Sequence, residues 1–523
     1  MSGTTGSYTT VQNVNYGPQA KADTATTYEN EFLLIDVLAN DLGGKAKVLW
    51  SLDQVDHAIR TTDGSKVTLA SGARVWFQDG KLAYDGVGAT GFDYLAGGES
   101  ATDTFTYAIR MSTGVVSYAT VTVTVRGTND APTIVLGGDT SGAATEDSAP
   151  VALVDAGSFQ FQDLDLTNSH TVAVGAARIS TSAGVPAGFV PGAGIGGLSA
   201  SVIENTFDTV STGSIAWTFA AANADVQGLA AGETVTQVYA LTITDSSGAA
   251  VTQDVTITLT GTNDGPTVVG GDFAGAMSED EAAATLGEAG SFTFQDLDLS
   301  NVHSVAVGAA QASTSSAVPA GFVPAAGFGT LTASVVETVT DLDNKGRIDW
   351  TYSVDNAAVQ GLAAGETVTQ VYTLTVTDSS GAPATQDVTI TLTGTNDGPT
   401  IVGGDVAGEM TEDEAATLGE AGSFTFQDLD LSNVHSVAVG AAQVSSSGAV
   451  PAGFVPAAGF GTLAATIAES VADLDDKGRI DWSYAVDNAA VQGLAAGETV
   501  TQVYALTITD SSGAAVTQDV TIT

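Results

Sequence analysis

Residues 367–377 read TVTQVYTLTVT, and residues 386–393 read QDVTITLT. Apolar residues alternate with Thr or other polar residues in both stretches, which indicates half-buried antiparallel β-strands. The turn sequence DSSG at 378–381 lies between them, so we expect the two strands to form a hairpin. Several strands of this kind recur within about 130 residues with almost no helical periodicity, which predicts a β-sandwich and an all-β fold.

The chain repeats this unit. GTND begins at Gly127, Gly261 and Gly394, and FQDLDL begins at Phe161, Phe294 and Phe426. These recurrences predict three copies that follow a different first domain. The predicted divisions are an N-terminal extension at 1–16, a first domain at 17–130, and repeats at 131–263, 264–396 and 397–523, with the last repeat truncated at its final strand. One repeat position carries a tryptophan in every copy, which we expect to fill the core: Trp217, Trp350 and Trp482.

Composition excludes several classes of function. The 523 residues include 14 Lys and Arg against 60 Asp and Glu, for a net charge of −46. Such a chain cannot assemble the basic face that nucleic acid or an anionic membrane requires. Because 43% of the residues are hydrophobic and only 14% charged, we place the acids on folded domains that attract cations.

Cysteine content, apolar runs and the N-terminal segment bear on where in or outside the cell the protein is located. Cysteine is absent, which excludes disulfides and thiolate metal sites. No apolar run approaches 18 residues, so we expect no membrane insertion. The first 18 residues lack the basic and apolar regions of a Sec signal peptide, so secretion would require another signal.

The repeat motifs resemble a known family. GTNDGP at 394–399, SEDE at 278–281, FQDLDLSNVHSV at 294–305 and GETVTQVYTLTVTDSSG at 365–381 are similar to the VCBS repeats of large bacterial surface proteins secreted by type I systems, including biofilm adhesins. Residues 17–130, with LIDVLAND at 34–41 and DTFTY at 103–107, resemble the bacterial cadherin-like domains that accompany them.

The resemblance implies tandem immunoglobulin-like or cadherin-like sandwiches in an elongated array, an extracellular location at the bacterial cell surface, and adhesion. Two features depart from the family: Asn168, Asn301 and Asn433 replace an acid that is common after DLD, and the RTX nonapeptide GGxGxD is absent.

Acidic and amide side chains gather at each predicted domain boundary. A Ca²⁺ ion takes six to eight oxygen ligands, so a site needs several such groups from different segments. From Asp264 to Glu279 the chain runs 15 residues, about 50 Å when extended and roughly the length of one sandwich, so we place Glu279 at the far end of its domain. A return strand then brings the DxD pair back to the near end.

This reasoning predicts three junction sites for Ca²⁺. Their members are Glu29, Asn129, Asp130, Asp163 and Asp165 at the first junction; Glu146, Asn263, Asp264, Asp296 and Asp298 at the second; and Glu279, Asn396, Asp397, Asp428 and Asp430 at the third. The arrangement is similar to cadherin linkers, although one linker acid of that pattern is missing, which implies fewer ions per junction. The alternative is that these residues are ordinary turn and solvated residues.

A second acidic loop, DLDNKGRID, runs from Asp341 to Asp349 and recurs as DLDDKGRID from Asp473 to Asp481. It matches the opening of an EF-hand loop, but Lys345 occupies a ligand position and no glutamate closes the loop. We favour an acidic hairpin turn.

The sequence supports a non-enzymatic function. The four histidines are His57, His170, His303 and His435, and the last three recur at one strand-like position, which favours a structural role. No GxSxG, HExxH or P-loop motif occurs.

We expect a calcium-rigidified spacer or adhesion segment of a surface adhesin. The alternative is a self-assembling subunit of a calcium-dependent surface layer or filament. Partners would be calcium, cell-surface or matrix glycans or proteins, or further copies of the chain.

Overall fold

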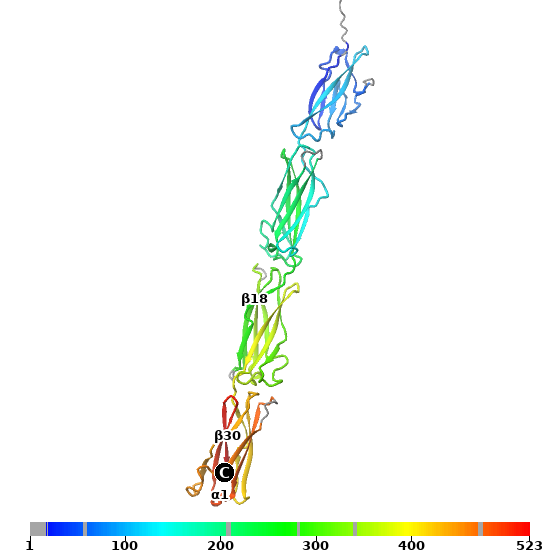
Figure 1. Ribbon diagram of the computed structural model, residues 1–523. Helices are drawn as coiled ribbons and strands as arrows, with labels where there is room; N and C mark the ends of the chain where they lie inside the picture. Colours follow the sequence, from blue (N-terminus) through cyan, green and yellow to red (C-terminus); the bar gives the residue numbers. More distant parts are fainter. Residues whose placement is uncertain are drawn as a thin grey trace, which may run out of the picture. The chain divides into compact units, whose positions relative to one another are not determined.

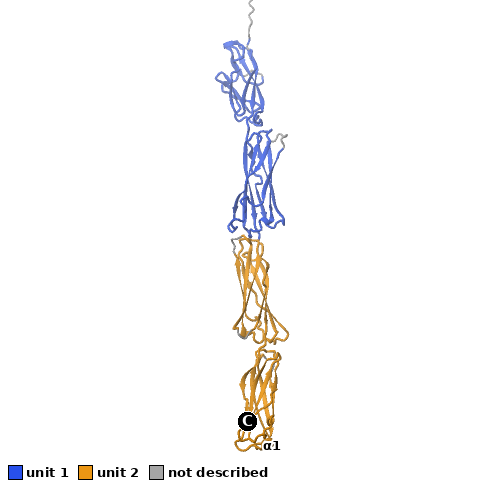
Figure 2. Ribbon diagram, turned by 90° about the vertical axis from the view of Figure 1, so that its left-hand side faces the viewer, with its two compact units in different colours: residues 1–262 blue, residues 263–523 orange. Residues whose placement is uncertain are grey.

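The computed structural model describes residues 17, 19–55, 60–204, 211–279, 283–337, 342–468 and 474–523. The chain divides into two compact units, Met1–Thr262 and Asn263–Thr523, which Figure 2 distinguishes by colour. Each unit contains two β-sandwiches with separate hydrophobic cores. Within the described residues, no helix has the length and hydropathy needed to cross a membrane.

The first sandwich pairs a sheet of order β1-β8-β7-β3 with a sheet of order β2-β6-β5-β4. Its elements are β1 (Asp23–Tyr28), β2 (Phe32–Ile35), the 3-10 helix η1 (Gly44–Ala46), β3 (Val48–Ser51), β4 (Val67–Thr68), β5 (Arg74–Gln78), β6 (Lys81–Asp85), β7 (Ser100–Arg110) and β8 (Val116–Arg126).

The second sandwich, also in the first unit, has sheets of order β14-β15-β11-β9 and β10-β17-β16-β12, and β13 also pairs with β16. Its elements are β9 (Thr133–Ile134), β10 (Ser141–Thr145), β11 (Ala152–Gln162), β12 (His170–Val174), β13 (Arg178–Thr181), β14 (Gly197–Ile203), β15 (Thr212–Ala222), η2 (Asn223–Asp225), β16 (Thr234–Asp245) and β17 (Ala250–Thr260).

The third sandwich repeats this topology, with sheets β18-β20-β24-β23 and β19-β26-β25-β21, and β22 on β25. Figure 1 labels β18. The elements are β18 (Thr267–Gly271), β19 (Ala274–Ser278), β20 (Thr285–Gln295), β21 (Ser304–Val307), β22 (Gln311–Thr314), β23 (Thr330–Glu337), β24 (Lys345–Asp355), η3 (Asn356–Ala358), β25 (Thr367–Thr377) and β26 (Pro383–Thr393).

The fourth sandwich has sheets β27-β29-β33-β32 and β28-β35-β34-β30, with β31 on β34; β30 and α1 are labelled in Figure 1. The elements are β27 (Thr400–Gly404), β28 (Ala407–Gly408), β29 (Thr417–Gln427), β30 (Ser436–Val439), β31 (Gln443–Ser446), β32 (Thr462–Ala468), β33 (Lys477–Asp487), α1 (Asn488–Val491), β34 (Val500–Thr509) and β35 (Ala515–Ile522).

The predicted hairpin is confirmed. β25 pairs antiparallel with β26, from Thr367 opposite Thr393 to Thr377 opposite Pro383. The apolar side chains of β25 are buried and its threonines are partly exposed, as the alternating sequence predicts. β26 starts at Pro383, earlier than the sequence indicates. The proline is tolerated because it is the first residue of the strand, where β19 does not pair with β26. The predicted tandem β-sandwich fold is therefore correct.

The recurrent tryptophans lie in the core, as predicted. Trp217, Trp350 and Trp482 are at most 2% exposed. Each indole N–H donates to a backbone carbonyl, that of Asp139, Asp272 and Asp405 respectively, at 2.7–2.9 Å. Burial of the ring therefore leaves no unsatisfied donor.

Among the described residues, each sandwich has one parallel strand pair. β1 runs parallel to β8, β10 to β17, β19 to β26 and β28 to β35. A parallel pair ends both strands at the same edge of the sheet. In the first three sandwiches, the residue after the shorter strand is a glutamate, and the residues after the longer strand are the GTND segment.

Candidate metal centre

The end of the third sandwich brings Glu279 beside the segment that enters the fourth. Ser278 is opposite Thr393 in the parallel pair of β19 and β26, so Glu279 follows directly at this edge. Its backbone N–H donates to Thr393 O at 3.1 Å, and its Oε1 accepts the N–H of Thr395 at 2.8 Å. The glutamate is therefore at the far end of its domain, as the chain-length argument predicts.

Asp430 comes to the same place from the turn after β29. Its backbone N–H donates to Asp428 Oδ1 at 3.0 Å. Its own Oδ2 accepts the backbone N–H of Asp397 at 3.1 Å and the amide of Asn433 at 2.9 Å. Near this turn, the Leu431 N–H donates to Gly361 O of the third sandwich at 3.4 Å.

These contacts gather three carboxylates. Oxygens of Glu279, Asp397 and Asp430 lie within 4.8 Å of one another, and all three residues are buried. Glu279 Oε2 and Asp430 Oδ1 have no hydrogen-bond partner among the described residues. The residues are 4% and 2% exposed, so these oxygens are also withdrawn from water. A buried carboxylate oxygen without a donor is unfavourable unless a cation approaches it.

The burial of these carboxylates is reflected in raised pKa values of Asp430 and Glu279. Burial, and then the nearby carboxylate of Asp428, raise the pKa of Asp430 to about 8. Burial also raises the pKa of Glu279 to about 8; the Thr395 N–H opposes this shift, and Asp397 and Glu366 add to it. In the absence of a cation, the site therefore favours protonated carboxyl groups.

Sequence reasoning missed Glu366. It is 5% exposed, its Oε2 accepts the Ala363 N–H at 3.1 Å, and its Oε1 is buried without a hydrogen-bond partner. Its charge contributes to the raised pKa of Glu279, so it lies close to the cluster. The signal in the sequence was the recurrence of AAGET at 230–234, 363–367 and 495–499.

The first unit contains a related arrangement. Thr128 donates its backbone N–H to Glu29 Oε1 at 2.5 Å, and Asp130 donates its own to Asp165 Oδ2 at 3.0 Å. Glu29 Oε2 and Asp165 Oδ1 are buried without partners. Burial raises the pKa of Asp165 to about 7, with Asp163, Asp130 and Glu29 adding to the shift.

Asp93 is a second acid that sequence reasoning missed. Burial raises the pKa of Asp130, and the Asp93 carboxylate adds to this increase. Asp93 has the same effect on the pKa of Glu29. It lies in the loop between β6 and β7, where no repeated motif marked it.

The first acid of each DxD pair is placed differently from the second. Asp428 uses Oδ1 for the Asp430 N–H and Oδ2 for His435 Nε2 at 2.7 Å. Asp163 and Asp296 make the equivalent two contacts, with His170 and His303. Both oxygens of these residues are therefore already bonded.

The boundary asparagines point to the DSSG turn. The side-chain amides of Asn129, Asn263 and Asn396 donate to Asp245, Asp378 and Asp510 respectively, at 2.9–3.1 Å. Asn396 Oδ1 is buried without a hydrogen-bond partner. The amide of Asn433, which departs from the family pattern, donates to Asp430, and its Oδ1 accepts Ser511 Oγ at 2.8 Å. An aspartate at position 433 would have no side-chain N–H to donate to Asp430.

The second predicted set divides between the two units. In the first unit, Glu146 Oε2 accepts the Thr262 N–H at 2.8 Å. In the second unit, Asp264 donates its backbone N–H to Asp298 Oδ2 at 3.1 Å. The contact of Glu146 matches those of Glu29 and Glu279, and the contact of Asp298 matches those of Asp165 and Asp430. The complete second set remains a prediction.

The acidic loop after β23 is the turn of a hairpin, as favoured from the sequence. β23 pairs antiparallel with β24, and Lys345, at a would-be ligand position, is the first residue of β24. Leu342 and Asn344 have left-handed φ values of 61° and 50°, which is a turn conformation. Asp341 and Asp473, like His57, lie outside the described residues.

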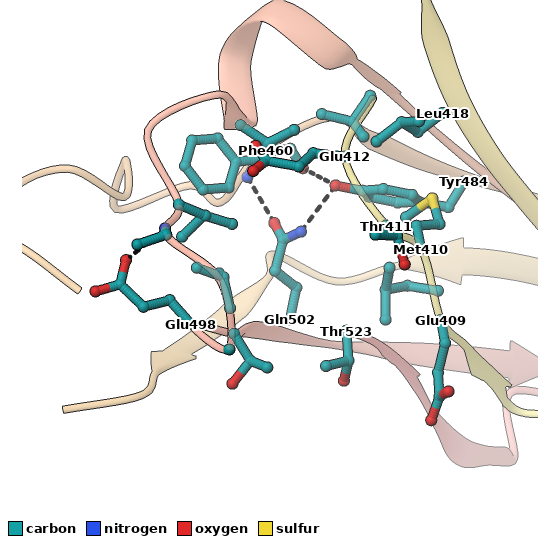
Figure 3. Close-up of a pocket in the computed structure, with 18 of the residues that line it drawn as sticks. Glu409, Met410, Thr411, Glu412, Leu418, Phe460, Tyr484, Glu498, Gln502 and Thr523 are labelled. Atoms are coloured by element: carbon teal, nitrogen blue, oxygen red, sulfur yellow. Dashed lines mark hydrogen bonds between the residues drawn. The ribbon is translucent and has the colours of Figure 1, made fainter. Parts of the chain in front are cut away.

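A cavity of about 430 Å³ opens in the fourth sandwich beside α1. Figure 3 shows Gln502 between Phe460 and Tyr484, with Met410, Glu412 and Leu418 along the wall. In the third sandwich, Val359 and Leu362, the counterparts of Val491 and Leu494 that line the cavity, belong to the hydrophobic core. Several of the side chains that line the cavity, including Leu418, Phe460 and Tyr484, belong to the hydrophobic core of the fourth sandwich.

The donor set of the centre fits a hard cation. It consists of carboxylate and amide oxygens, several of them buried and unpartnered, with no sulfur. Ca²⁺ accepts oxygen ligands of this kind in flexible geometry. Glu279, Asp397 and Asp430 would hold the ion, and the buried Glu366 lies near enough to Glu279 to act on its pKa.

No family model matches the chain, and no curated protein does. Solved structures that resemble it include PcdhgB3 EC1-4, with 12% identity, a TM-score of 0.33, and coverage of 96% of this chain and 98% of the other. Protocadherin Gamma B2 extracellular cadherin domains 1–5 have 12% identity and a TM-score of 0.39 over 97% and 80% of the two chains. Drosophila N-cadherin EC1-4 has 10% identity and a TM-score of 0.26 over 96% and 98%. At these values the likeness carries no functional argument.

Proposed function

We propose that this chain is a calcium-binding spacer or adhesion segment of a bacterial surface adhesin with VCBS-type repeats, located at the cell surface. One observation carries the proposal: Glu279, Asp397 and Asp430 place buried carboxylate oxygens within 4.8 Å of one another, and Glu279 Oε2 and Asp430 Oδ1 have no hydrogen-bond partner among the described residues. The repeat motifs support the family assignment.

The proposed mechanism is electrostatic. Glu279 belongs to the third sandwich, and Asp430 to the fourth. Without a cation their charges repel, and part of that repulsion is relieved only by proton uptake. Bound Ca²⁺ supplies the compensating positive charge. The ligand residues of both sandwiches then favour one arrangement, so the linker stiffens. Extracellular calcium modules bind at about 10⁻⁴ to 10⁻³ M, which leaves them empty in the cytosol and filled outside the cell.

Melting curves in EDTA and in millimolar Ca²⁺ test the proposal. Because a ligand that binds only the native state stabilises it by mass action, we expect the melting temperature to rise with calcium. Mg²⁺ at equal concentration is the control, since it binds such flexible oxygen sites poorly. Coincident curves in EDTA and calcium would contradict the proposal.

Small-angle scattering on the same samples addresses the assembly state. A spacer stays monomeric in calcium and its linkers lose flexibility. A subunit of a surface layer or filament would instead increase in mass with calcium.

A further inference from the structure

We propose that His435, and equally His170 and His303, is a positioning residue that holds the DxD turn so that its second aspartate faces the cation. The inference rests on the calcium site proposed above and extends it to a residue that does not itself bind the ion.

The histidine is buried and bonded on both sides. His303 Nε2 lies 2.8 Å from Asp296 Oδ2, and its Nδ1 lies 2.8 Å from Glu337 Oε2. The side chain is 4% exposed. Glu337 Oε1 also accepts the backbone N–H of His303 at 2.8 Å. The imidazole therefore bridges the turn after β20 to the end of β23.

The same trio occurs in the second sandwich, although that repeat differs more in sequence. His170 Nε2 is 2.8 Å from Asp163, and its Nδ1 is 2.7 Å from Glu204. In the fourth sandwich His435 contacts Asp428 at 2.7 Å, and the corresponding Glu469 lies outside the described residues. The ring also packs on the phenylalanine that opens the turn, with a centroid distance of 4.8 Å between His435 and Phe426.

A short chain of contacts leads from the histidine to the site. His435 engages Asp428 Oδ2, Asp428 Oδ1 accepts the Asp430 N–H, and Asp430 Oδ2 accepts the Asp397 N–H. The remaining oxygen, Asp430 Oδ1, is left for a cation. Each hydrogen bond in this chain uses one particular carboxylate oxygen. The side-chain rotamer of Asp428 therefore determines the direction in which the Asp430 carboxylate faces.

Asp428 needs a donor at this position. It is 4% exposed, and its carboxylate is the largest charged influence on Asp430. Without an N–H on Oδ2, the buried carboxylate would be left unsatisfied and would rotate to find another donor. Residues that orient metal ligands from behind commonly change metal affinity by about 10- to 100-fold when they are replaced.

The test uses the full chain and a reporter for this site alone. Hydrogen exchange of the peptide 393–402 includes the amides of Thr395 and Asp397, which donate to Glu279 and Asp430. Its mass differs from that of peptide 260–269 because Ile401 replaces Val268. Titration with free Ca²⁺ therefore gives a separate midpoint for each linker in one sample.

We expect His435→Phe, which keeps a ring but has no donor, to raise the calcium midpoint of peptide 393–402 about tenfold or more. His435→Gln, which keeps an N–H, should raise it less than about threefold on the same reasoning. The midpoint of peptide 260–269 should not change in either variant. Gln502→Leu is the matched control, because it breaks buried contacts to Phe460 and Tyr484 in the same sandwich but outside the turn.

A double-mutant cycle separates positioning from general stability. If His435 acts through Asp428, His435→Phe should cost little further affinity in an Asp428→Asn background; additive losses would overturn the inference. If His435→Phe does not fold, His435→Leu, which also has no donor, takes its place in the cycle. An unchanged midpoint in His435→Phe, together with a shifted one in Glu279→Gln, would overturn the inference and leave the calcium site standing. If neither variant changes the exchange and calcium has no effect, the proposed function itself fails.

Discussion

Thr395 donates its backbone N–H to Glu279 Oε1 at 2.8 Å, although 116 positions separate the two residues in the chain. The contact exists because β19 and β26 run parallel and end together. It leaves Glu279 Oε2 buried and unpartnered beside Asp397 and Asp430. The backbone thus orients the carboxylate, and one oxygen remains for a cation.

Replacement of Glu279 tests the ligand set. At pH 8.5, above the pKa of Glu279 of about 8, Glu279→Gln keeps the acceptor for Thr395 but removes a charge, so repulsion in the metal-free site falls. We expect the melting temperature in EDTA to rise slightly and the increase caused by calcium to shrink. Calorimetry with and without calcium measures both effects. Glu414→Gln, at an exposed position, removes the same charge and should change neither; an equal response in the two variants would contradict the assignment.

Stability of the metal-free chain should fall as pH rises. The pKa of Asp430 and that of Glu279 are each about 8 in the folded state, against about 4 in an unfolded chain. The folded state therefore binds more protons between these values. This contribution is fully present below pH 4 and is lost as pH rises through 8.

Melting in EDTA from pH 5.5 to 8.5 measures this slope. Calcium must displace those protons, so the stabilisation by calcium should grow over the same range. The double variant Glu279→Gln with Asp430→Asn should flatten both trends. A metal-free stability that increases with pH through this window would contradict the raised pKa values.

The glycine of GTND has a packing role. A Cβ on Gly394 would overlap Leu362 O and Ala363 O, while the backbone there bonds to Glu366 O at 2.9 Å. Gly394→Ala should therefore destabilise the third sandwich by about 1–3 kcal/mol. Pulse proteolysis in urea measures the loss. In the control, Gly287→Ala, the nearest atom is Tyr352 O at 3.5 Å, and we expect little change.

Asn433 tests the departure from the family pattern. Its amide donates to Asp430 Oδ2 at 2.9 Å, so Asn433→Asp replaces a donor with a second negative charge. We expect a loss of about 1–3 kcal/mol in EDTA, with much of it recovered in calcium. Ser511→Ala removes the other partner of Asn433 without adding charge. If Asn433→Asp behaves like Ser511→Ala, the charge argument is wrong.

Local patterns were sufficient for the strands. The alternation in TVTQVYTLTVT predicts which side chains of β25 are buried, because successive side chains of a strand point to opposite faces. Repetition then located the sandwiches, and the recurring tryptophans located their cores. The chain length between Asp264 and Glu279 placed the glutamate at the far end of its domain, because an extended strand has a fixed rise per residue.

Roles within the acidic sets were not predictable in the same way. The sequence treats Asp428 and Asp430 alike, since both belong to one DxD pair. The structure separates them, because His435 satisfies Asp428 while Asp430 retains a free oxygen. Glu366 and Asp93 were missed because each reaches the site from a loop, where no periodic pattern predicts direction.

The sequence by itself determined the all-β repeat architecture and the gathering of acids at the boundaries, because strand periodicity and repeat spacing are local properties of the chain. Only the tertiary structure decided which oxygens converge and which are already bonded. Convergence depends on the parallel pairing of β19 with β26 and on the rotamers of buried side chains, and both are set by contacts between residues far apart in the chain.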